Sequence, residues 1–236
     1  MAIIDNHKSV KIDKSFEDKH PEMFKFFNDR NIDVVVSDNF VDFEKFLTGL
    51  SKKEYPYNYD EFFNETMVYD GDDFALYLKK DNEIIATYAA KVLAFGQFNE
   101  DFENYFYQES GSNPDMNIDE LANLVMYNPG RHMYSSCQWV STSHRGKGMG
   151  MMLDHLKKNI CFDIFNADSN YAIHKEAFTE YHTKGLHYDD SIWMATVPQG
   201  DVGGAGEEKD KVYNVTWVTK ESWANKLDDV RKLYNR

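Results

Sequence analysis

The pattern of apolar and polar positions changes period several times in the first half of the chain. Residues 32–37, IDVVVS, form a β-branched run that is typical of a buried strand. Residues 40–50 then repeat apolar side chains at the spacing of one helix face. Two further apolar stretches, 73–78 and 83–92, flank the turn-forming pair Asp81-Asn82 and predict a hairpin. A strand, a helix and a hairpin are therefore expected in this order.

The second half continues this alternation. Residues 132–142 alternate as a strand does, and the helical pattern that follows runs from Met149 to Ile164. Residues 191–197 and 212–218 are expected as closing strands. The predicted strand and helix meet at RGKGMG, residues 145–150, which carries three glycines.

A long helical insertion is expected at residues 96–134. Two helical patterns lie on either side of GSNPD, and Asn128-Pro129-Gly130 ends the second. An insertion of this size tends to be functional, and extra packing over a sheet edge explains it equally well. Its acidic side chains either attract a cationic amine or form a solvated face; they are Asp101, Glu103 and Glu109. Residues 1–30 show no clear period and are expected as an N-terminal extension.

The composition narrows the class of protein and its partners. With 236 residues and 42% hydrophobic content the chain can bury one sizeable core, which predicts a single domain. A net charge of -14 argues against a nucleic acid as the main partner, because nucleic-acid affinity comes from clustered lysine and arginine. Cys137 and Cys161 make neither a disulfide framework nor a C-x-x-C metal site, and no apolar run is long enough to span a bilayer. We expect a cytoplasmic protein with no metal and no membrane partner, and the sequence leaves a homodimer open.

The glycine-containing loop is suited to a phosphate group. Unpaired backbone amides converge at a helix N-terminus, where the helix dipole adds roughly half a positive charge. Glycines let the backbone approach a ligand closely because they carry no side chain. The loop at 145–150 therefore predicts a phosphate or pyrophosphate site.

The spacing of the loop distinguishes between phosphate ligands. The loop matches neither G-x-x-x-x-G-K-[ST] nor G-x-G-x-x-G. It fits R-x-x-G-x-G, with Arg145, Gly148 and Gly150 at the fixed positions. This is the coenzyme A pyrophosphate motif of the GNAT superfamily of acyl-CoA-dependent N-acyltransferases, which the chain resembles over residues 31–220.

A second segment carries the same resemblance. HKEAFTEYHTKGL, residues 174–186, is similar to the family's N-x-x-A-x-x-x-Y-x-x-x-G-F. His174 stands where Asn is common, and Leu186 replaces the usual Phe. The resemblance implies an α/β (α+β) fold with a mixed, mostly antiparallel central sheet flanked by helices, in one domain over 1–236 with its core at about 31–220.

The activity implied by the resemblance is direct attack of a primary amine on the thioester of acyl-CoA, most simply acetyl-CoA, in a ternary complex. The acceptor would be a small-molecule or peptide amine. Backbone groups of Gln138 and Val140 would pair with the pantetheine arm. The full set of residues expected to bind the coenzyme is Gln138, Trp139, Val140, Arg145, Gly146, Lys147, Gly148, Met149, Gly150 and His174.

The catalytic residues are less sharply indicated. Tyr181 matches the tyrosine that protonates the leaving thiolate in the family, and a packed core tyrosine is the alternative. His132, Tyr134, Ser136 and Gln138 share one strand face by period 2, and no glutamate lies on that face. The base is then His132, Tyr134 or a chain of waters. His132 is otherwise a surface residue at a strand end, and His174 either contacts pantetheine or caps the helix that follows it.

Three hypotheses follow from the sequence. The first is a GNAT N-acetyltransferase acting on an amine. The second is a noncatalytic acyl-CoA-binding or regulatory module on the same fold, which the missing glutamate and the altered Asn position allow. The third is an acyltransferase that modifies nucleic acid.

Overall fold

A computed structural model of the chain describes residues 3–6, 11–51, 53–55, 73–92, 115–117, 130–197 and 211–234. The two predicted helices of the insertion lie outside the described residues, as do its acidic side chains Asp101, Glu103 and Glu109. All statements below concern the described parts.

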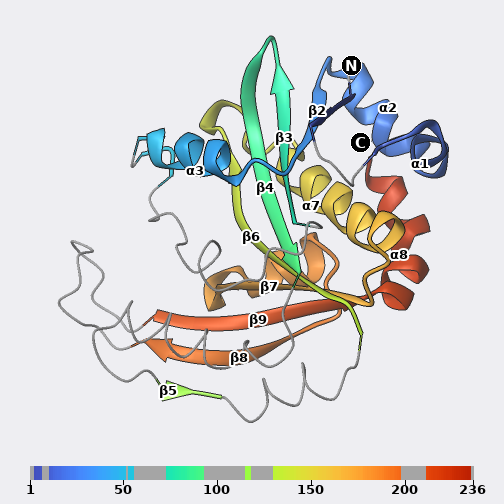
Figure 1. Ribbon diagram of the computed structural model, residues 1–236. Coiled ribbons are helices and arrows are strands. Elements are labelled where there is room, and N and C mark those ends of the chain that lie inside the picture. Colours follow the sequence, from blue (N-terminus) through green and yellow to red (C-terminus); the bar gives the residue numbers. More distant parts are fainter. Residues whose placement is uncertain are drawn as a thin grey trace.

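One sheet organises the described chain, in the strand order β1-β2-β3-β4-β6-β7-β9-β8-β5. Its strands are antiparallel except for the pairs β1–β2 and β6–β7, which confirms the predicted mixed, mostly antiparallel sheet. In Figure 1, β3 and β4 stand upright while β7, β9 and β8 lie across them, so the sheet turns strongly near β6. The strands are β1 (Ile3–Asn6), β2 (Asp33–Ser37), β3 (Phe74–Lys80), β4 (Glu83–Val92), β5 (Asp115–Met116), β6 (His132–Val140), β7 (Ser169–Lys175), β8 (Asp190–Val197) and β9 (Lys211–Thr219).

The helices cover the two faces of the sheet unequally. Figure 1 shows α1, α2, α7 and α8 gathered on one side and α3 on the other. Met23, Leu153 and Trp223, from three of the four helices, share one buried cluster, while Phe43 of α3 belongs to a second cluster on the opposite face. The bounds are α1 (Lys14–Lys19), α2 (Pro21–Asp29), α3 (Phe40–Gly49), α7 (Met149–Asn159) and α8 (Lys220–Leu233).

The local patterns explain several of these elements. In β2, Val34 and Val36 enter the cluster of α7 and Val35 enters that of α3, so this β-branched run is buried on both faces. The side chain of Asn39 accepts a hydrogen bond from the amide of Asp42 and caps α3. The hairpin β3–β4 is confirmed: Asp81 and Asn82 both have positive φ, as a tight hairpin turn requires.

The segment before residue 31, which shows no clear period in the sequence, joins the sheet and the core. β1 pairs in parallel with β2, and α2 buries Met23 and Phe27 completely. Pro21 opens α2, where its missing amide hydrogen costs nothing. The buried residues of α2 recur at helical spacing, so a repeat was present in this segment; they are Met23, Phe24, Phe26 and Phe27.

The strands β6 and β7 pair with each other along only part of their length. Their parallel pairing runs from His132↔Ser169 to Ser135↔Ala172 and then ends. Beyond it, β6 continues to Val140 paired with β4, and β7 continues to Lys175 paired with β9. We call the region between residues 136–140 of β6 and 173–175 of β7 the split. Two strand edges face it without pairing to each other, at the end of β6 that leads to α7.

Candidate active site

The loop between β6 and α7 has the backbone geometry of an anion site. A short 3-10 turn at Thr142–His144 leads into residues 145–148, and α7 begins at Met149. Gly146 and Gly148 have φ of 73° and 78°, a left-handed conformation that favours glycine. Gly148 is the N-cap of α7 and offers no side chain to the first amides of the helix. These amides therefore remain suited to an anionic ligand.

Arg145 closes this loop against the chain. Its Nε donates to the carbonyl of Val140 at 2.9 Å and its Nη2 donates to the carbonyl of Glu54 at 2.9 Å. The Glu54 carboxylate accepts from the amide of Thr142 at 3.1 Å, and this bond holds the Glu54 pKa below its usual value. Lys147 Nζ donates to the Ser143 carbonyl at 2.8 Å. The arginine of the motif thus holds the loop in shape as well as carrying positive charge.

A bulge in β6 changes which side chains face α7. The register with β4 shifts between Thr87 and Ala89, so the bulged strand β6 has one more residue than its partner there. Gln138 then turns toward α7, where its Nε2 donates to the carbonyl of Gly150 at 2.8 Å. The expectation that His132, Tyr134 and Gln138 share one face is wrong, because the bulge inverts the alternation between them.

Gly150 is the point at which the loop, the strand end and Tyr181 meet. A Cβ on Gly150 would lie 3.2 Å from the Tyr181 hydroxyl, 3.5 Å from Val140 Cγ2 and 3.6 Å from Gln138 Nε2. A larger residue at this position would push the phenol away. The last glycine of the motif therefore permits a close approach between α7 and Tyr181.

Tyr181 begins a π-helical turn, Tyr181–Gly185, that follows β7. A Cβ on Gly185 would come within 3.1 Å of the Tyr181 ring, which explains the glycine in the Y-x-x-x-G spacing. The side chain is 43% exposed, yet its hydroxyl points at α7. Burial of the hydroxyl and the negative charge of Asp154 raise the pKa of Tyr181 to about 12, so the phenol is protonated at neutral pH.

His174 packs against a second histidine beside the split. Its ring stacks on His182 with centroids 4.1 Å apart, and its Nδ1 bonds the carbonyl of Lys175 at 2.9 Å. The short helix that follows β7 has Lys175 at its N-cap and no side-chain cap, so His174 does not cap it. Burial lowers the pKa of both histidines, that of His182 to about 3. Both rings are therefore neutral at physiological pH.

His132 and Tyr134 lie in the closed, paired part of the sheet. His132 is buried, not at the surface, with Nδ1 2.6 Å from Ser169 Oγ and its ring edge-on to Tyr171. Tyr134 is 4% exposed and belongs to the apolar cluster of Trp139 on the α3 face. Neither residue shares the face on which Tyr181 meets α7.

Trp139 and Met149 also point into the core rather than the loop. Trp139 donates through Nε1 to the Glu54 carbonyl at 3.2 Å, and both side chains are nearly fully buried. Only their backbone groups are placed to contact a ligand at the split or the loop.

The fold of this chain is similar to that of several solved structures, although its sequence matches no known family. No known family profile matches the sequence, and no curated protein matches it. A polyamine N-acetyltransferase from Drosophila melanogaster superposes with a TM-score of 0.54 at 12% identity, over 79% of this chain and all (100%) of that one. An N-acyl amino acid synthase from uncultured soil microbes superposes with a TM-score of 0.51 at 9% identity, over 82% of this chain and 92% of that one.

The chain has the GNAT fold. An agmatine N-acetyltransferase gives the same result, with a TM-score of 0.54 at 12% identity over 79% of this chain and 99% of that one. At these identities the similarity to the GNAT structures is one of fold.

Two further kinds of feature concern metals and membranes. Among the described residues, no group of three or more His, Cys, Asp or Glu side chains is arranged to hold a metal ion. Of the helices that the structure describes, none combines the length and apolar character needed to cross a membrane.

The polar residues buried on α7 were not predicted from the sequence. Asp154, Lys157 and Lys158 are completely buried, although the helical pattern placed only apolar residues inward. The helix α8 was not predicted either, and its Trp223 and Val230 cover this region of α7. These two apolar residues lie seven positions apart, which is the sequence signal that could have indicated a covering helix. A helix covered on both sides cannot keep a solvated polar face.

Proposed function

We propose that this protein is an N-acyltransferase that moves an acyl group, most simply acetyl, from acyl-CoA to a primary amine. One observation carries the proposal: the split between β6 and β7 ends where the Tyr181 hydroxyl meets the first turn of α7 at Gly150. A thioester lying in the split would have an anion site at one end and a protonated phenol beside its sulfur. The GNAT fold supports this assignment.

The coenzyme would be held mainly by backbone groups. Amides of residues 146–150 would bind the pyrophosphate, with Arg145 and Lys147 holding the loop and adding positive charge. The pantetheine arm would pair with the open edge of β6 at Gln138 and Val140, as an added strand pairs with a sheet edge. His174 would line the β7 side of the same channel.

The neutral amine attacks the carbonyl carbon of the thioester and forms a carbon–nitrogen bond. The carbon–sulfur bond then breaks, and the departing thiolate takes the proton of the Tyr181 hydroxyl. The nitrogen loses one proton to water as the amide forms, and water returns a proton to the Tyr181 phenolate. Holding both substrates in line supplies much of the acceleration.

The ammonium proton of the acceptor requires a separate route. His132 and Tyr134 lie in the closed part of the sheet and bond or pack elsewhere, which disfavours them as bases. We propose that this proton leaves through water, the remaining alternative from the sequence.

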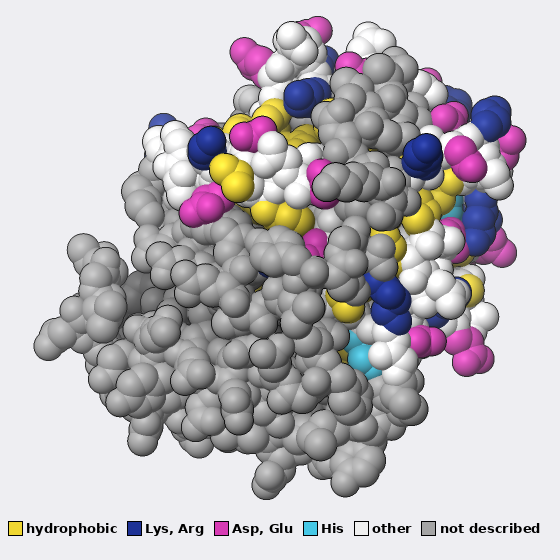
Figure 2. Space-filling view, in the orientation of Figure 1, with side chains coloured by type: hydrophobic (Ala, Val, Ile, Leu, Met, Phe, Trp, Pro, Cys, Tyr) yellow, Lys and Arg dark blue, Asp and Glu magenta, His cyan; other side chains and the backbone are white. Residues whose placement is uncertain are grey.

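The acceptor is proposed to be a small-molecule or peptide amine. On the face shown in Figure 2, lysine and arginine side chains of the described residues are interspersed with acidic ones and do not gather into one basic surface. With a net charge of -14, the protein would attract an ammonium and repel a phosphate backbone. A polyamine and agmatine N-acetyltransferase share the fold, which supports this class of acceptor.

The proposal is tested by thiol release from acetyl-CoA and longer acyl-CoAs with a panel of polyamines, amino acids and peptides. Amine-dependent release is expected. Stabilisation by acyl-CoA without release for any amine would favour a noncatalytic binding module. Salt-sensitive binding to DNA or RNA would be required for the nucleic-acid hypothesis.

A further inference from the structure

A residue of the N-terminal extension contacts the loop that would hold the coenzyme. We call residues 141–148, between β6 and α7, the coenzyme loop. Phe26 of α2 is 5% exposed, and its Cζ lies 3.9 Å from the position that a Cβ would occupy on Gly148. Gly148 is the N-cap of α7, where the first helical amides are suited to an anion. This contact comes from residues 1–30, which lie outside the part of the chain that resembles the GNAT family.

Arg30 covers the face of the same aromatic ring. Its Cζ lies 3.8 Å from the centroid of the Phe26 ring, and its Nη1 donates to the Phe26 carbonyl at 3.3 Å. Arg30 is the C-cap of α2, so this hydrogen bond also satisfies a carbonyl at the end of that helix. Stacking and one hydrogen bond thus hold the guanidinium against a ring whose tip contacts Gly148.

Most of the hydrogen-bonding capacity of Arg30 is unused within the described residues. A guanidinium has five N–H donors, and the bond to the Phe26 carbonyl engages one of them. No carboxylate of the described residues lies within ion-pair distance of Arg30, whereas Arg231 lies within that distance of Asp228 and Glu22. The Arg30 side chain is also partly exposed. Such an arginine is suited to a phosphate group, which a guanidinium binds through two parallel hydrogen bonds.

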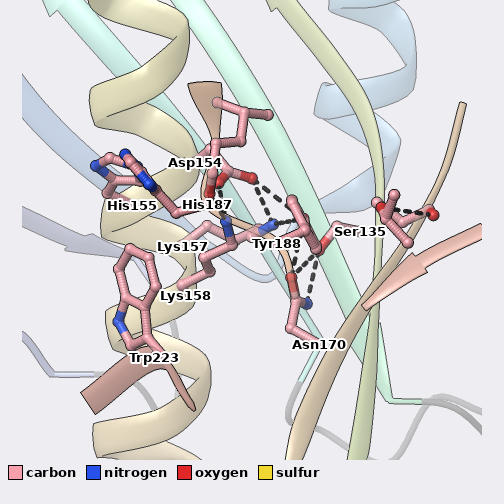
Figure 3. A network of polar contacts seen from close by, with 12 residues as sticks. Ser135, Asp154, His155, Lys157, Lys158, Asn170, His187, Tyr188 and Trp223 are labelled. Atoms are coloured by element: carbon pink, nitrogen blue, oxygen red, sulfur yellow. Dashed lines mark hydrogen bonds and ion pairs between the residues drawn. The ribbon is translucent and has the colours of Figure 1, made fainter. Parts of the chain in front are cut away.

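Other cations on this side of the sheet are engaged differently. The arginine and lysine of the coenzyme loop donate to backbone carbonyls and hold the loop in shape. Further along α7, Lys157 and Lys158 are completely buried and lie 2.8 Å and 2.6 Å from the carboxylate oxygens of Asp154 (Figure 3). Arg30 differs from both groups, because its protein contacts are confined to Phe26 in its own helix.

An acidic chain needs local cations to hold acyl-CoA. The coenzyme carries several negative charges, and a protein with a net charge of -14 repels it at long range. The amides at the start of α7 supply a partial charge, roughly half a unit. Arg30 adds a full positive charge, and stacking on Phe26 already restricts its side chain, so less conformational freedom is lost when a ligand binds.

We propose that Arg30 binds a phosphate group of acyl-CoA, so that the N-terminal extension completes the coenzyme site. The ligand chemistry is that of the 3′-phospho-ADP end of the coenzyme, which carries a pyrophosphate and a phosphate on the ribose. In the proposed function the loop amides bind the pyrophosphate, and Arg30, one aromatic ring away from Gly148, adds a cation for either group. This inference rests on that proposed function.

The test is direct binding of CoA and 3′-dephospho-CoA to the full chain by calorimetry, without an acceptor amine. Arg30→Met removes the charge and should weaken CoA binding by about tenfold or more, as expected for a charge-assisted hydrogen bond. The loss should shrink as the salt concentration rises. A loss confined to CoA assigns Arg30 to the ribose 3′-phosphate, and an equal loss with 3′-dephospho-CoA assigns it to the pyrophosphate.

Lys25→Met is the matched control, because it removes one positive charge from the same helix at an exposed side chain that pairs with Asp29. It should leave CoA affinity near wild type. Arg30→Lys keeps the charge without the planar fork and should recover part of the affinity lost in Arg30→Met.

Two results overturn the proposal while leaving the proposed function in place. One is wild-type CoA affinity in Arg30→Met, and the other is an equal loss of affinity in Arg30→Met and Lys25→Met, each with a melting temperature that shows a folded protein. If the wild-type chain binds neither CoA nor 3′-dephospho-CoA, the proposed function and this inference are both wrong.

Discussion

The hydroxyl of Tyr181 lies 3.2 Å from the position that a Cβ would occupy on Gly150. The start of α7 and a residue 31 positions later in the chain are thus so close that a Cβ at residue 150 would require the phenol to move by a few tenths of an ångström. This relationship joins the two sequence motifs into one site, and it can be tested from either side.

Gly150→Ala should lower turnover by less than about tenfold, because the phenol must move by only a few tenths of an ångström. Stability should not fall, since alanine is the better helix former at an ordinary helical position. Steady-state kinetics and melting temperature measure both effects. Gly49→Ala in α3, where a Cβ would meet nothing within 4 Å, is the control and should leave turnover unchanged.

Gly148→Val should weaken acyl-CoA binding and also strain the loop, because φ of 78° costs a β-branched residue about 1–2 kcal/mol. Gly148→Asn separates the two effects, since asparagine tolerates this conformation. We expect Gly148→Asn to melt near wild type and still to bind acyl-CoA more weakly by calorimetry. If both folded variants bind acyl-CoA with wild-type affinity, the assignment of the pyrophosphate site to this loop is wrong.

Tyr181→Phe should reduce the turnover number by up to about 10²-fold while acyl-CoA affinity stays near wild type. General acid help is typically worth about 10²- to 10⁴-fold, and a thiolate is already a fair leaving group. Because the ring remains, its edge contact with His182 is kept. Unchanged turnover with a lower melting temperature would identify Tyr181 as a packing residue.

Tyr134→Phe makes the same chemical change on the opposite face. If Tyr134 is buried only for packing, its variant should affect stability and leave the pH profile of turnover unaltered. A loss of turnover as large as that of Tyr181→Phe would restore Tyr134 as the base.

Acid should destabilise the fold before the carboxylates titrate. Burial lowers the pKa of His155, His174, His182 and His187, so these rings stay neutral when the same residues in the unfolded chain bind protons. Below pH about 6.5 the unfolded state binds more protons, and each such histidine lowers the unfolding free energy by about 1.4 kcal/mol per pH unit until its folded pKa is reached.

His182→Phe provides the check on this pH dependence. The folded pKa of His182 is about 3, so its contribution should extend from pH 6.5 to the lowest accessible pH. The unfolding free energy, measured with denaturant between pH 7 and 4.5, should fall less steeply with decreasing pH in the variant. The difference in slope should correspond to one proton fewer bound on unfolding. An unchanged slope would mean that His182 protonates in the folded state.

Much of the fold follows from local pattern. The hairpin, the strand at β2 and the helix after the glycines are confirmed because each carries its period over a whole element. The orientation of Gln138 was not predictable, because a single extra residue in β6 inverts the alternation. The burial of Asp154, Lys157 and Lys158 was hidden for a different reason. Tyr188 and α8 reach α7 only through tertiary packing, and Trp223 covers a side of the helix that a sequence pattern assigns to solvent.

Residues 152–160 are buried; they comprise most of α7 and the first residue of the π-helical turn that follows it. This burial has a consequence for ligand binding at the start of the helix. Backbone amides in this stretch should be among the slowest to exchange with deuterium, because they open only when the surrounding core does. The first turn, at Met149 and Gly150, is attached to this rigid segment. An anion arriving there meets donors that are already ordered, so the entropy lost on binding falls on the ligand and not on the helix.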